Sequence, residues 1–183
     1  MSTWNSRGLR GSTFEDLINS TNEYYRKHKL ALVQKIPTPI TPLKFNSEKK
    51  LITEAYFEKD STVDYIGVVQ SIPVCFDAKE CKTDTFSLQN IHDHQFRFMT
   101  EFEAQGGISF LLIHFTMRND FYYMPFADLR QYMERVKEGH PKNVKYLELR
   151  DEYFIKPQGG ALVAYLNGLQ LDLSERDAAG SGD

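Results

Sequence analysis

The sequence has few cysteines, no long apolar run and no acidic residue before Glu15, and each absence limits what the protein can be. Cys75 and Cys81 are the only cysteines among 183 residues. Because no second pair completes a disulfide framework or a zinc site, we interpret them as reduced thiols. No stretch of eighteen or more apolar residues occurs, so we expect no membrane-spanning helix. Residues 1–10 are polar and lack an apolar h-region, so we expect no secretory signal and a cytoplasmic protein.

The net charge of −3 averages two parts of opposite sign. The first fifty residues hold nine Lys and Arg against four acids, a net charge of +5, which leaves −8 for the rest of the chain. A basic segment on an acidic protein is enough to contact phosphates. Residues 1–12, rich in Gly, Ser and Arg, predict a flexible basic arm.

The first part of the chain predicts a helix, a strand and a protrusion. Ser12 and Glu15 have the spacing of a capping box that opens a helix. The run "LALVQKI" over 30–36 predicts a strand. Three prolines then occur within six residues, and prolines at that density exclude a central strand or helix. We therefore expect residues 37–57 to leave the domain as a semi-rigid stalk.

The rest of the chain alternates between strand and helix patterns. The predicted elements are strands at 62–70, 72–79, 108–115 and 120–126, and helices from Ser87 to about Gln105 and over 126–138. Residues 144–173 are weakly patterned apart from a short helix in "ALVAYLNGL". We expect residues 174–183 to form a disordered tail. This order predicts an α/β fold, a mixed β-sheet flanked by helices, in a single domain over 13–173.

Three ionisable residues lie within the apolar hairpin expected at 62–79. Alternation places Asp77 and Lys79 on one face of their strand, and antiparallel pairing brings Asp64 next to them. A structural ion pair between Lys79 and one aspartate is the simpler interpretation. Apolar segments flank the cluster, however, so uncompensated charges would be costly, which favours a bound ligand or metal. Two carboxylates, with Glu15 of the first helix as a third, suit a hard divalent cation such as Mg²⁺.

The pattern of Asp64 followed by Asp77, Ala78 and Lys79 resembles the motif of the PD-(D/E)XK nuclease superfamily, whose fold is restriction-endonuclease-like. More of the chain is similar to one family within it, the RecU-type Holliday junction resolvases of Gram-positive bacteria and their phages. The similar stretches, in order within residues 7–125, are "RG…FEDLINSTNEYY", "KIPTPI", "EAYFEKDSTVDYIGV", "FDAKE" and "SLQNIHDHQ".

This resemblance implies Mg²⁺-dependent hydrolysis of phosphodiester bonds in four-way DNA junctions, as symmetric paired nicks during recombination and repair. Asp64, Asp77, Glu15 and the carbonyl of Ala78 would hold Mg²⁺, for which Mn²⁺ could substitute. Lys79 would position the attacking water or stabilise the transition state. The family more often has glutamate at the position of Asp77, and the shorter side chain withdraws the ligand by about 1.5 Å.

The resemblance also makes the predicted stalk a segment that enters the open centre of the junction. The residues expected to contact DNA are Arg7, Arg10, Lys35, Lys44, Lys49, Lys50, Thr62 and Gln95. An ordinary surface loop is the alternative for the stalk, and a solvent-facing side chain is the alternative for Gln95. Two symmetric cuts imply a homodimer, for which the aromatic residues of 108–126 are a candidate interface. A recombinase is a further candidate partner.

Two other functions stay open at the level of the sequence. One is a PD-(D/E)XK endonuclease that cuts duplex or flapped DNA, and the other is a non-catalytic DNA-binding recombination factor. The joint presence of Asp64, Asp77 and Lys79 argues against the second, because a chain without catalysis would readily lose one of them.

Overall fold

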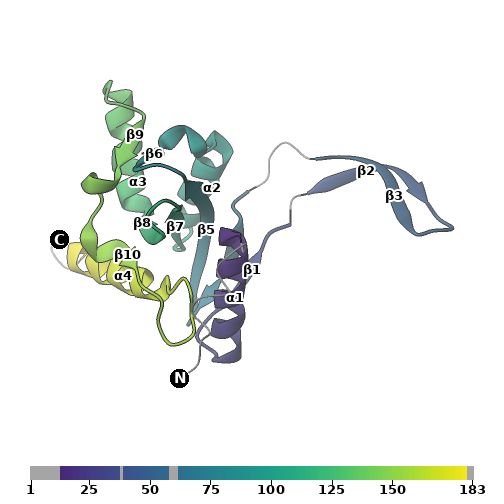
Figure 1. Cartoon of the computed structure of the whole chain (residues 1–183), viewed down its shortest axis with the longest axis horizontal. Helices are drawn as coiled ribbons and strands as arrows, with labels where there is room; N and C mark the ends of the chain where they lie inside the picture. The colour runs from purple at the N-terminus through teal and green to yellow at the C-terminus, as the bar shows by residue number, and fades with distance from the viewer. Residues whose placement is uncertain (1–12, 38, 58–61, 181–183) are drawn as a thin grey trace.

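The computed structural model describes residues 13–37, 39–57 and 62–180, and a six-stranded mixed sheet lies at its centre (Figure 1). The strands, in spatial order, are β1 (Leu32–Lys35), β4 (Tyr65–Val69), β5 (Ile72–Cys81), β7 (Ile108–Phe115), β8 (Asp120–Pro125) and β10 (Phe154–Ile155). Strands β5 and β7 are parallel, and the other neighbouring pairs are antiparallel. The predicted mixed sheet is confirmed.

Helices cover both faces of this sheet. Helices α1 (Phe14–Lys27) and α4 (Leu166–Gly180) lie on one face, where the Phe14 ring stacks on Phe121 and Gly168 packs against Tyr123. Helices α2 (Asp93–Ala104) and α3 (Phe126–Lys137) lie on the other. The remaining elements are small. Strand β6 (Thr85–Ser87) pairs with β9 (Asn143–Lys145), and 3₁₀ helices lie at Leu88–Asn90, Tyr146–Glu148 and Asp151–Tyr153. None of the described helices is long and apolar enough to cross a bilayer.

The centre of the sheet is held by aromatic rings on the face that α1 and α4 cover. Tyr65, Phe76, Phe110 and Tyr123 come from four neighbouring strands, and their consecutive ring centroids lie 4.8, 4.7 and 4.4 Å apart. All four residues have an exposed fraction of 0%. Stacked rings of this size contribute both apolar burial and specific ring contacts. Since the aromatic residues of 108–126 belong to this core, the sequence-based assignment of them to a dimer interface is wrong.

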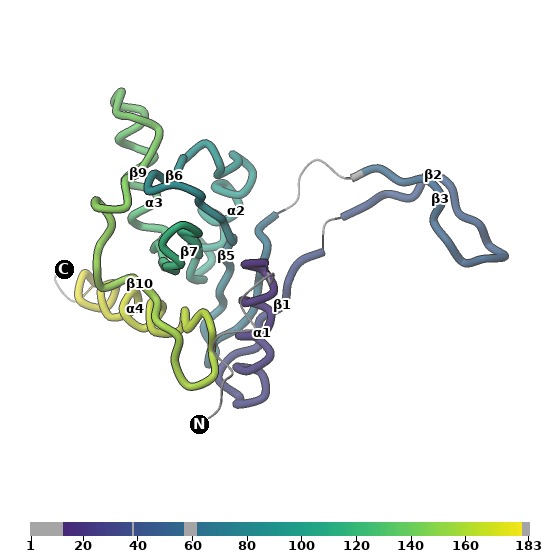
Figure 2. The backbone as a smooth tube through the Cα atoms, viewed as in Figure 1, coloured from purple at the N-terminus to yellow at the C-terminus, as the bar shows by residue number. Residues whose placement is uncertain are grey.

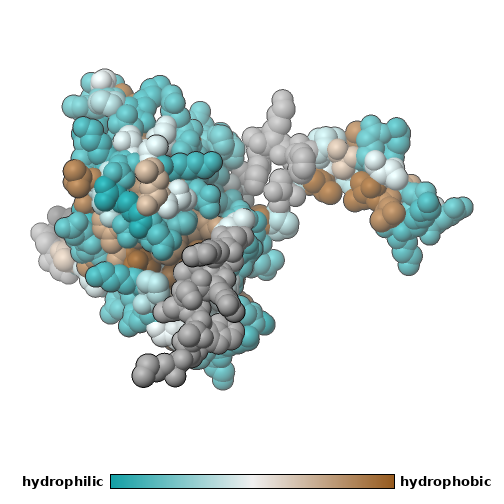
Figure 3. All heavy atoms as spheres, viewed as in Figure 1, coloured by the Kyte–Doolittle hydropathy of each residue, from teal (hydrophilic) through white to brown (hydrophobic). Residues whose placement is uncertain are grey.

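The expected stalk is a β-hairpin that projects from the domain (Figure 2). Strands β2 (Ile40–Asn46) and β3 (Leu51–Phe57) pair only with each other in the described chain. This agrees with the expectation that the prolines exclude the segment from the centre of a sheet. Apolar side chains of the hairpin are exposed to solvent, and they appear as the brown patch on the projecting arm in Figure 3. The large ones are Ile40, Leu43, Phe45, Leu51, Ile52 and Tyr56.

A two-residue turn joins β4 to β5. Gln70 and Ser71 both have left-handed backbone, with φ of 47° and 75°, as a type I′ turn requires. The turn sets the register so that Tyr65 faces Phe76. Asp64, the residue before β4, therefore lies opposite Asp77 on the face that α2 covers.

Two helix starts differ from the sequence-based expectation. The first helix is capped by Thr13, whose side chain forms a capping box with Asp16 in place of Ser12 and Glu15. The second helix begins at Asp93, with His92 as its N-cap. Ser87 was expected to cap it, but the segment after "CKTD" first pairs with β9 as strand β6 and then forms a 3₁₀ turn.

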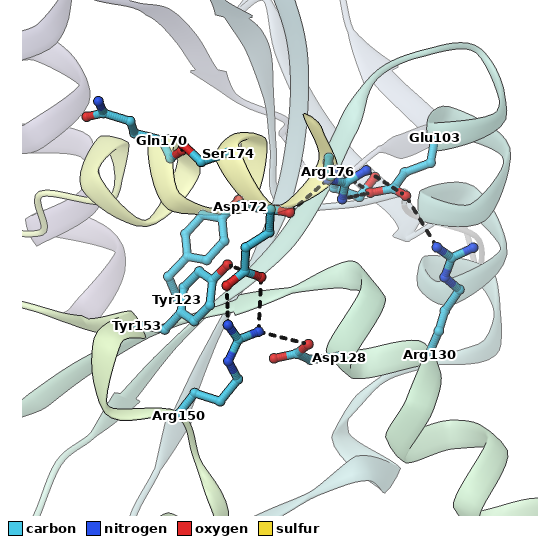
Figure 4. Close-up of polar contacts among 12 residues, drawn as sticks. Glu103, Tyr123, Asp128, Arg130, Arg150, Tyr153, Gln170, Asp172, Ser174 and Arg176 are labelled. Atoms are coloured by element: carbon cyan, nitrogen blue, oxygen red, sulfur yellow. Dashed lines mark hydrogen bonds and ion pairs between the residues drawn. The ribbon is translucent and has the colours of Figure 1, made fainter. Parts of the chain in front are cut away.

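A disordered tail was expected over 174–183, but α4 continues through residues 174–180, and residues 181–183 lie outside the described residues. Figure 4 shows the contacts that order α4. Arg176 lies 2.7 Å from Asp172 on its own helix and 2.7 Å from Glu103 at the end of α2. Glu175 pairs with Arg150, which precedes a 3₁₀ helix. Glu103 and Arg150 are distant in sequence from α4, so the polar composition of the tail gave no sign of these contacts.

Candidate active site

Asp77 is the most enclosed charged residue of the site, with an exposed fraction of 0%. The Nε2 of Gln95 donates a hydrogen bond of 2.7 Å to Oδ1 of Asp77. Lys79 forms an ion pair with the other oxygen, its Nζ lying 2.6 Å from Oδ2. That oxygen receives no well-directed hydrogen bond from the residues that the structure describes. A buried carboxylate oxygen in this state is suited to a further ligand.

Asp64 is placed beside Asp77 by the register of β4 and β5. Its Oδ2 accepts a hydrogen bond of 2.9 Å from the backbone N–H of Ala78. Burial and the nearby charge of Asp64 raise the pKa of Asp77, Lys79 partly offsets both, and the resulting pKa is about 7. Two carboxyl groups thus lie next to each other, and a bound cation would relieve the repulsion between their charged forms.

Gln95 connects the two functional groups of β5. While its amide nitrogen binds Asp77, its Oε1 accepts hydrogen bonds from Lys79 Nζ at 3.3 Å and from the backbone N–H of His92 at 3.2 Å. The exposed fraction of Gln95 is 7%, whereas that of the Lys79 side chain is 18%. The solvent-facing alternative for Gln95 is therefore wrong. The lysine keeps an exposed side from which a phosphate can approach.

Glu15 does not join the two aspartates in this structure. It lies on α1, across the sheet from α2, and its carboxylate is paired with Lys35 of β1. Among the described residues, no three His, Cys, Asp or Glu side chains gather closely enough to hold a metal ion. Mg²⁺ commonly binds one or two carboxylates and keeps several waters, so the pair Asp64 and Asp77 suffices for it.

Glu80 is a nearby residue that the sequence did not single out. It follows Lys79 on β5 and points to the opposite face, where it accepts a hydrogen bond of 3.2 Å from the backbone N–H of Phe14. A carboxylate at a helix N-terminus offsets the helix dipole and one unpaired N–H group. Glu80 thus fixes the start of α1 against the strand that bears the site. No local pattern indicates this contact, because its partners are 66 residues apart.

The other residues expected to contact DNA are spread over the hairpin and its base. Lys44 is paired with Glu54 across the hairpin, while Lys49 and Lys50 are exposed in its turn. Lys50 adopts left-handed backbone with φ of 51°. Thr62 is exposed close to Asp64. Arg7 and Arg10 lie outside the described residues.

Comparison with known proteins gives the same family as the motifs. The family model of recombination protein U, RecU, matches residues 9–171. A Holliday junction resolvase RecU of Leuconostoc mesenteroides is 41% identical over 155 residues, which cover 82% of this chain and 75% of that protein. The RecU of Limosilactobacillus reuteri is 38% identical over 165 residues, which cover 87% and 81%. Among solved structures, Archaeoglobus fulgidus Hjc, a Holliday junction resolvase, aligns with a TM-score of 0.42 at 10% identity over 72% of this chain and 89% of that one.

The family model and the relatives make this chain an enzyme of the nuclease type. The chain belongs to the RecU family of Holliday junction resolvases, which are DNA endonucleases. The family and the function class expected from the sequence are thereby confirmed.

Proposed function

We propose that this protein cuts four-way DNA junctions by Mg²⁺-dependent hydrolysis of two symmetrically placed phosphodiester bonds. The observation that carries the proposal is the cluster formed by Asp64, Asp77 and Lys79 on one face of the sheet. Within the RecU family this cluster supplies the charges that phosphodiester hydrolysis requires. Two carboxylates can hold the cation, and one partly exposed ammonium can contact the phosphate.

The residues that would hold Mg²⁺ are Asp64 and Asp77, together with the carbonyl of Ala78. Their oxygen atoms are the ligands that this cation prefers, and the buried Oδ2 of Asp77 lacks a directed hydrogen bond among the described residues. When bound, Mg²⁺ supplies Lewis acidity toward the phosphate and a lower pKa for coordinated water. The same oxygen ligands would also bind Mn²⁺. Glu15 can join them only if its carboxylate leaves Lys35.

Lys79 and Gln95 have separate tasks in this proposal. Lys79 places a positive charge next to the phosphate and stabilises the negative charge that develops on its oxygens. Gln95 holds the carboxylate of Asp77 and the ammonium of Lys79 in fixed relative positions, because it is hydrogen-bonded to both. Its own position is fixed by the backbone of His92.

The hairpin provides the substrate selectivity in this proposal. Its lysines, with Lys35 and Thr62 at its base and Arg7 and Arg10 of the N-terminal arm, would contact phosphates of the four arms. Contacts of this kind recognise the shape of DNA and carry no sequence information. A projecting two-stranded hairpin suits the open centre of a four-way junction, which linear duplex lacks.

Two symmetric cuts require two active sites, so we infer a homodimer. The apolar side chains of Leu32 and Val68 are paired across β1 and β4 and are 64% and 44% exposed. Because β1 is an edge strand of the main sheet, this surface replaces residues 108–126 as the candidate interface. A cytoplasmic location and a recombinase partner follow from a role in recombination.

The test compares cleavage of labelled four-way junction, linear duplex and flap, each with Mg²⁺ or with EDTA. We expect paired nicks in the junction alone, and only with Mg²⁺. Equal cutting of all three substrates would indicate a general endonuclease. Binding without cleavage, unchanged in Asp77→Ala, would indicate a non-catalytic recombination factor.

The Lys79→Ala variant separates catalysis from binding in the same assay. We expect it to lose cleavage and to keep junction binding, because Lys79 faces the enclosed carboxylate more than the surface. Lys156→Ala, which removes an exposed lysine away from the site, is the matched control. Loss of junction binding in Lys79→Ala would assign Lys79 to substrate affinity and contradict the proposed role.

A further inference from the structure

A cavity lies at the beginning of α2, on the same face of the sheet as the candidate active site. Its volume is about 370 Å³, at the lower end of the range of small-molecule sites. The floor is apolar, formed by Leu88 and Ile91 before α2 and by Met133 and Val136 of α3. Polar side chains stand around it, namely Gln89, His92, Asp93 and Lys142. Such a combination accommodates a ligand with flat apolar faces and a polar edge.

A single side chain connects this cavity to the catalytic cluster. His92 lines the cavity, and its backbone N–H donates to Gln95, whose amide donates in turn to Asp77. Successive nucleotides of a DNA strand advance by about 3.4 Å. A base within a few nucleotides of a phosphate held at Asp77 and Lys79 can therefore reach the cavity.

His92 supplies an aromatic ring to the lining of the cavity, and the ring of His94 lies against it from outside the lining. The rings of His92 and His94 are stacked, with centroids 5.5 Å apart and planes inclined by 14°. Bases stack on such rings with little dependence on sequence. The carboxylate of Asp93 adds an acceptor for an exocyclic amino group, which does depend on the identity of the base. The cavity thus offers both a stacking surface and a means of discrimination.

We propose that this cavity binds a nucleobase displaced from the strand that is being cut, and that it sets the sequence preference of cleavage. The inference rests on the proposed nuclease function and adds a base-specific site to it. The apolar floor receives the face of the base, His92 stacks on it, and Asp93 reads its edge. Unstacking a base costs a few kcal/mol, and an open four-way junction lowers this cost because base stacking is already interrupted at its centre.

The experiment maps cleavage on a junction with a homologous, mobile core, so that the branch point visits many sequences. Wild-type protein is expected to cut a small subset of positions. Met133→Trp fills the cavity, and Asp93→Asn changes its edge acceptor. We expect each to reduce the ratio of preferred to other cuts by about 10-fold. Met117→Trp is the control, since Met117 is 79% exposed outside the cavity.

The outcomes distinguish this inference from the proposed function. Wild-type protein that cuts no junction would overturn the proposed function. It would overturn the inference as well, because no strand would be cut whose base the cavity could bind. Wild-type protein that cuts junctions without any preference would overturn the inference alone. An equal fall in rate at every position in folded Met133→Trp and Asp93→Asn would also overturn it, because a structural defect slows all cuts alike. Should Met133→Trp fail to fold, Asp93→Asn decides the question.

Discussion

The carboxyl group of Asp77 lies in a position from which water is excluded. Its carboxylate is bound by Gln95 on one oxygen and paired with Lys79 on the other. Burial and the nearby charge of Asp64 oppose its ionisation, so the metal-free protein retains a proton there up to about neutral pH. Binding of a divalent cation at this site should release that proton.

The raised pKa of Asp77 predicts how stability depends on pH. The folded protein holds the proton more tightly than the unfolded chain. The proton on Asp77 therefore stabilises the folded state, and this stabilisation is complete below about pH 4. It is lost as pH rises toward about 7. In EDTA, Asp77→Asn should therefore reduce the fall in unfolding free energy between pH 5 and pH 8 by about 2 kcal/mol. Denaturant unfolding at both pH values measures this.

Asp84→Asn is the control for that measurement. The hydrogen bonds of Arg118 lower the pKa of Asp84, so it is ionised throughout this range. Removal of its charge should leave the difference in unfolding free energy between pH 5 and pH 8 unaltered. An Asp77→Asn protein with the wild-type pH dependence would contradict the assignment of the titration to Asp77.

Gln95 should act on the rate of cleavage and leave DNA affinity unchanged. In Gln95→Ala, Asp77 and Lys79 lose the amide that fixes their relative positions. We expect kcat to fall by about 10-fold or more, because misplacement by about 1 Å can cost 100-fold. The Kd for junction DNA should stay constant, since Gln95 is 7% exposed. Single-turnover cleavage and gel-shift titration measure the two quantities, and a weaker Kd with an unchanged rate would contradict this role.

At the level of residues, the sequence predicted the cluster better than its surroundings. Asp64, Asp77 and Lys79 could be placed together because strand alternation and one tight turn determine their positions. Gln95 was recognised as relevant, but the expected helix start at Ser87 gave no basis for its contact with His92. The pairs of Glu15 with Lys35 and of Glu80 with Phe14 depend on how α1 docks on the sheet. Docking of that kind has no local signature.

At the level of elements, α4 shows how ion pairs order a segment of polar composition. Arg176 binds Glu103 and Asp172, whose side chains are only 10% and 3% exposed. The carboxylate of Asp172 also accepts a hydrogen bond from the buried hydroxyl of Tyr123 at 3.0 Å. The helix end is therefore attached to both α2 and β8.

Removal of Arg176 should destabilise the whole domain. Arg176→Ala leaves the enclosed carboxylate of Asp172 without its cation and Glu103 with only the longer pair to Arg130 at 3.8 Å, which costs about 3 kcal/mol. Denaturant unfolding of the metal-free protein measures this value. Arg26→Ala is the matched control, because its pair with Glu23 is exposed on both sides and contributes little. Equal stability of the two variants would mean that the end of α4 is not held by this pair.

The strands that the sequence predicted are those with apolar runs or alternation over several residues. Outside the stalk, the strands it missed are very short: β6 and β9 have three residues each and β10 has two. Segments of that length carry no measurable period, and tertiary pairing alone defines them. The proline-rich stalk was predicted as an excursion, but its pairing into a hairpin was not.

At the level of the whole molecule, the hairpin lysines should determine much of the salt dependence of DNA binding. Each phosphate contact contributes about 0.9 to the slope of log K against log salt. Lys49 and Lys50 are exposed in the turn, whereas Lys44 is paired with Glu54. Replacing all three by alanine should reduce the magnitude of the slope by about 2. A value of about 3 would require that Lys44, which is paired with Glu54, also contacts a phosphate.

Fluorescence titrations of labelled junction at several salt concentrations give this slope. Lys137→Ala is the control, since that lysine lies on α3 and is paired with Glu134. An unchanged slope in the triple variant would exclude the hairpin turn from phosphate contact.

The turn at Gln70 and Ser71 limits how the gene can vary. A strand presents alternate residues to alternate faces, so one inserted codon in the turn would shift the pairing of β4 with β5 by one position. Asp64 would then point toward α1 while Asp77 still pointed toward α2. Insertions and deletions elsewhere on the surface can be tolerated one at a time. In this turn, a change of length abolishes the carboxylate pair even where the sheet still forms, so homologous genes should vary here by substitution alone.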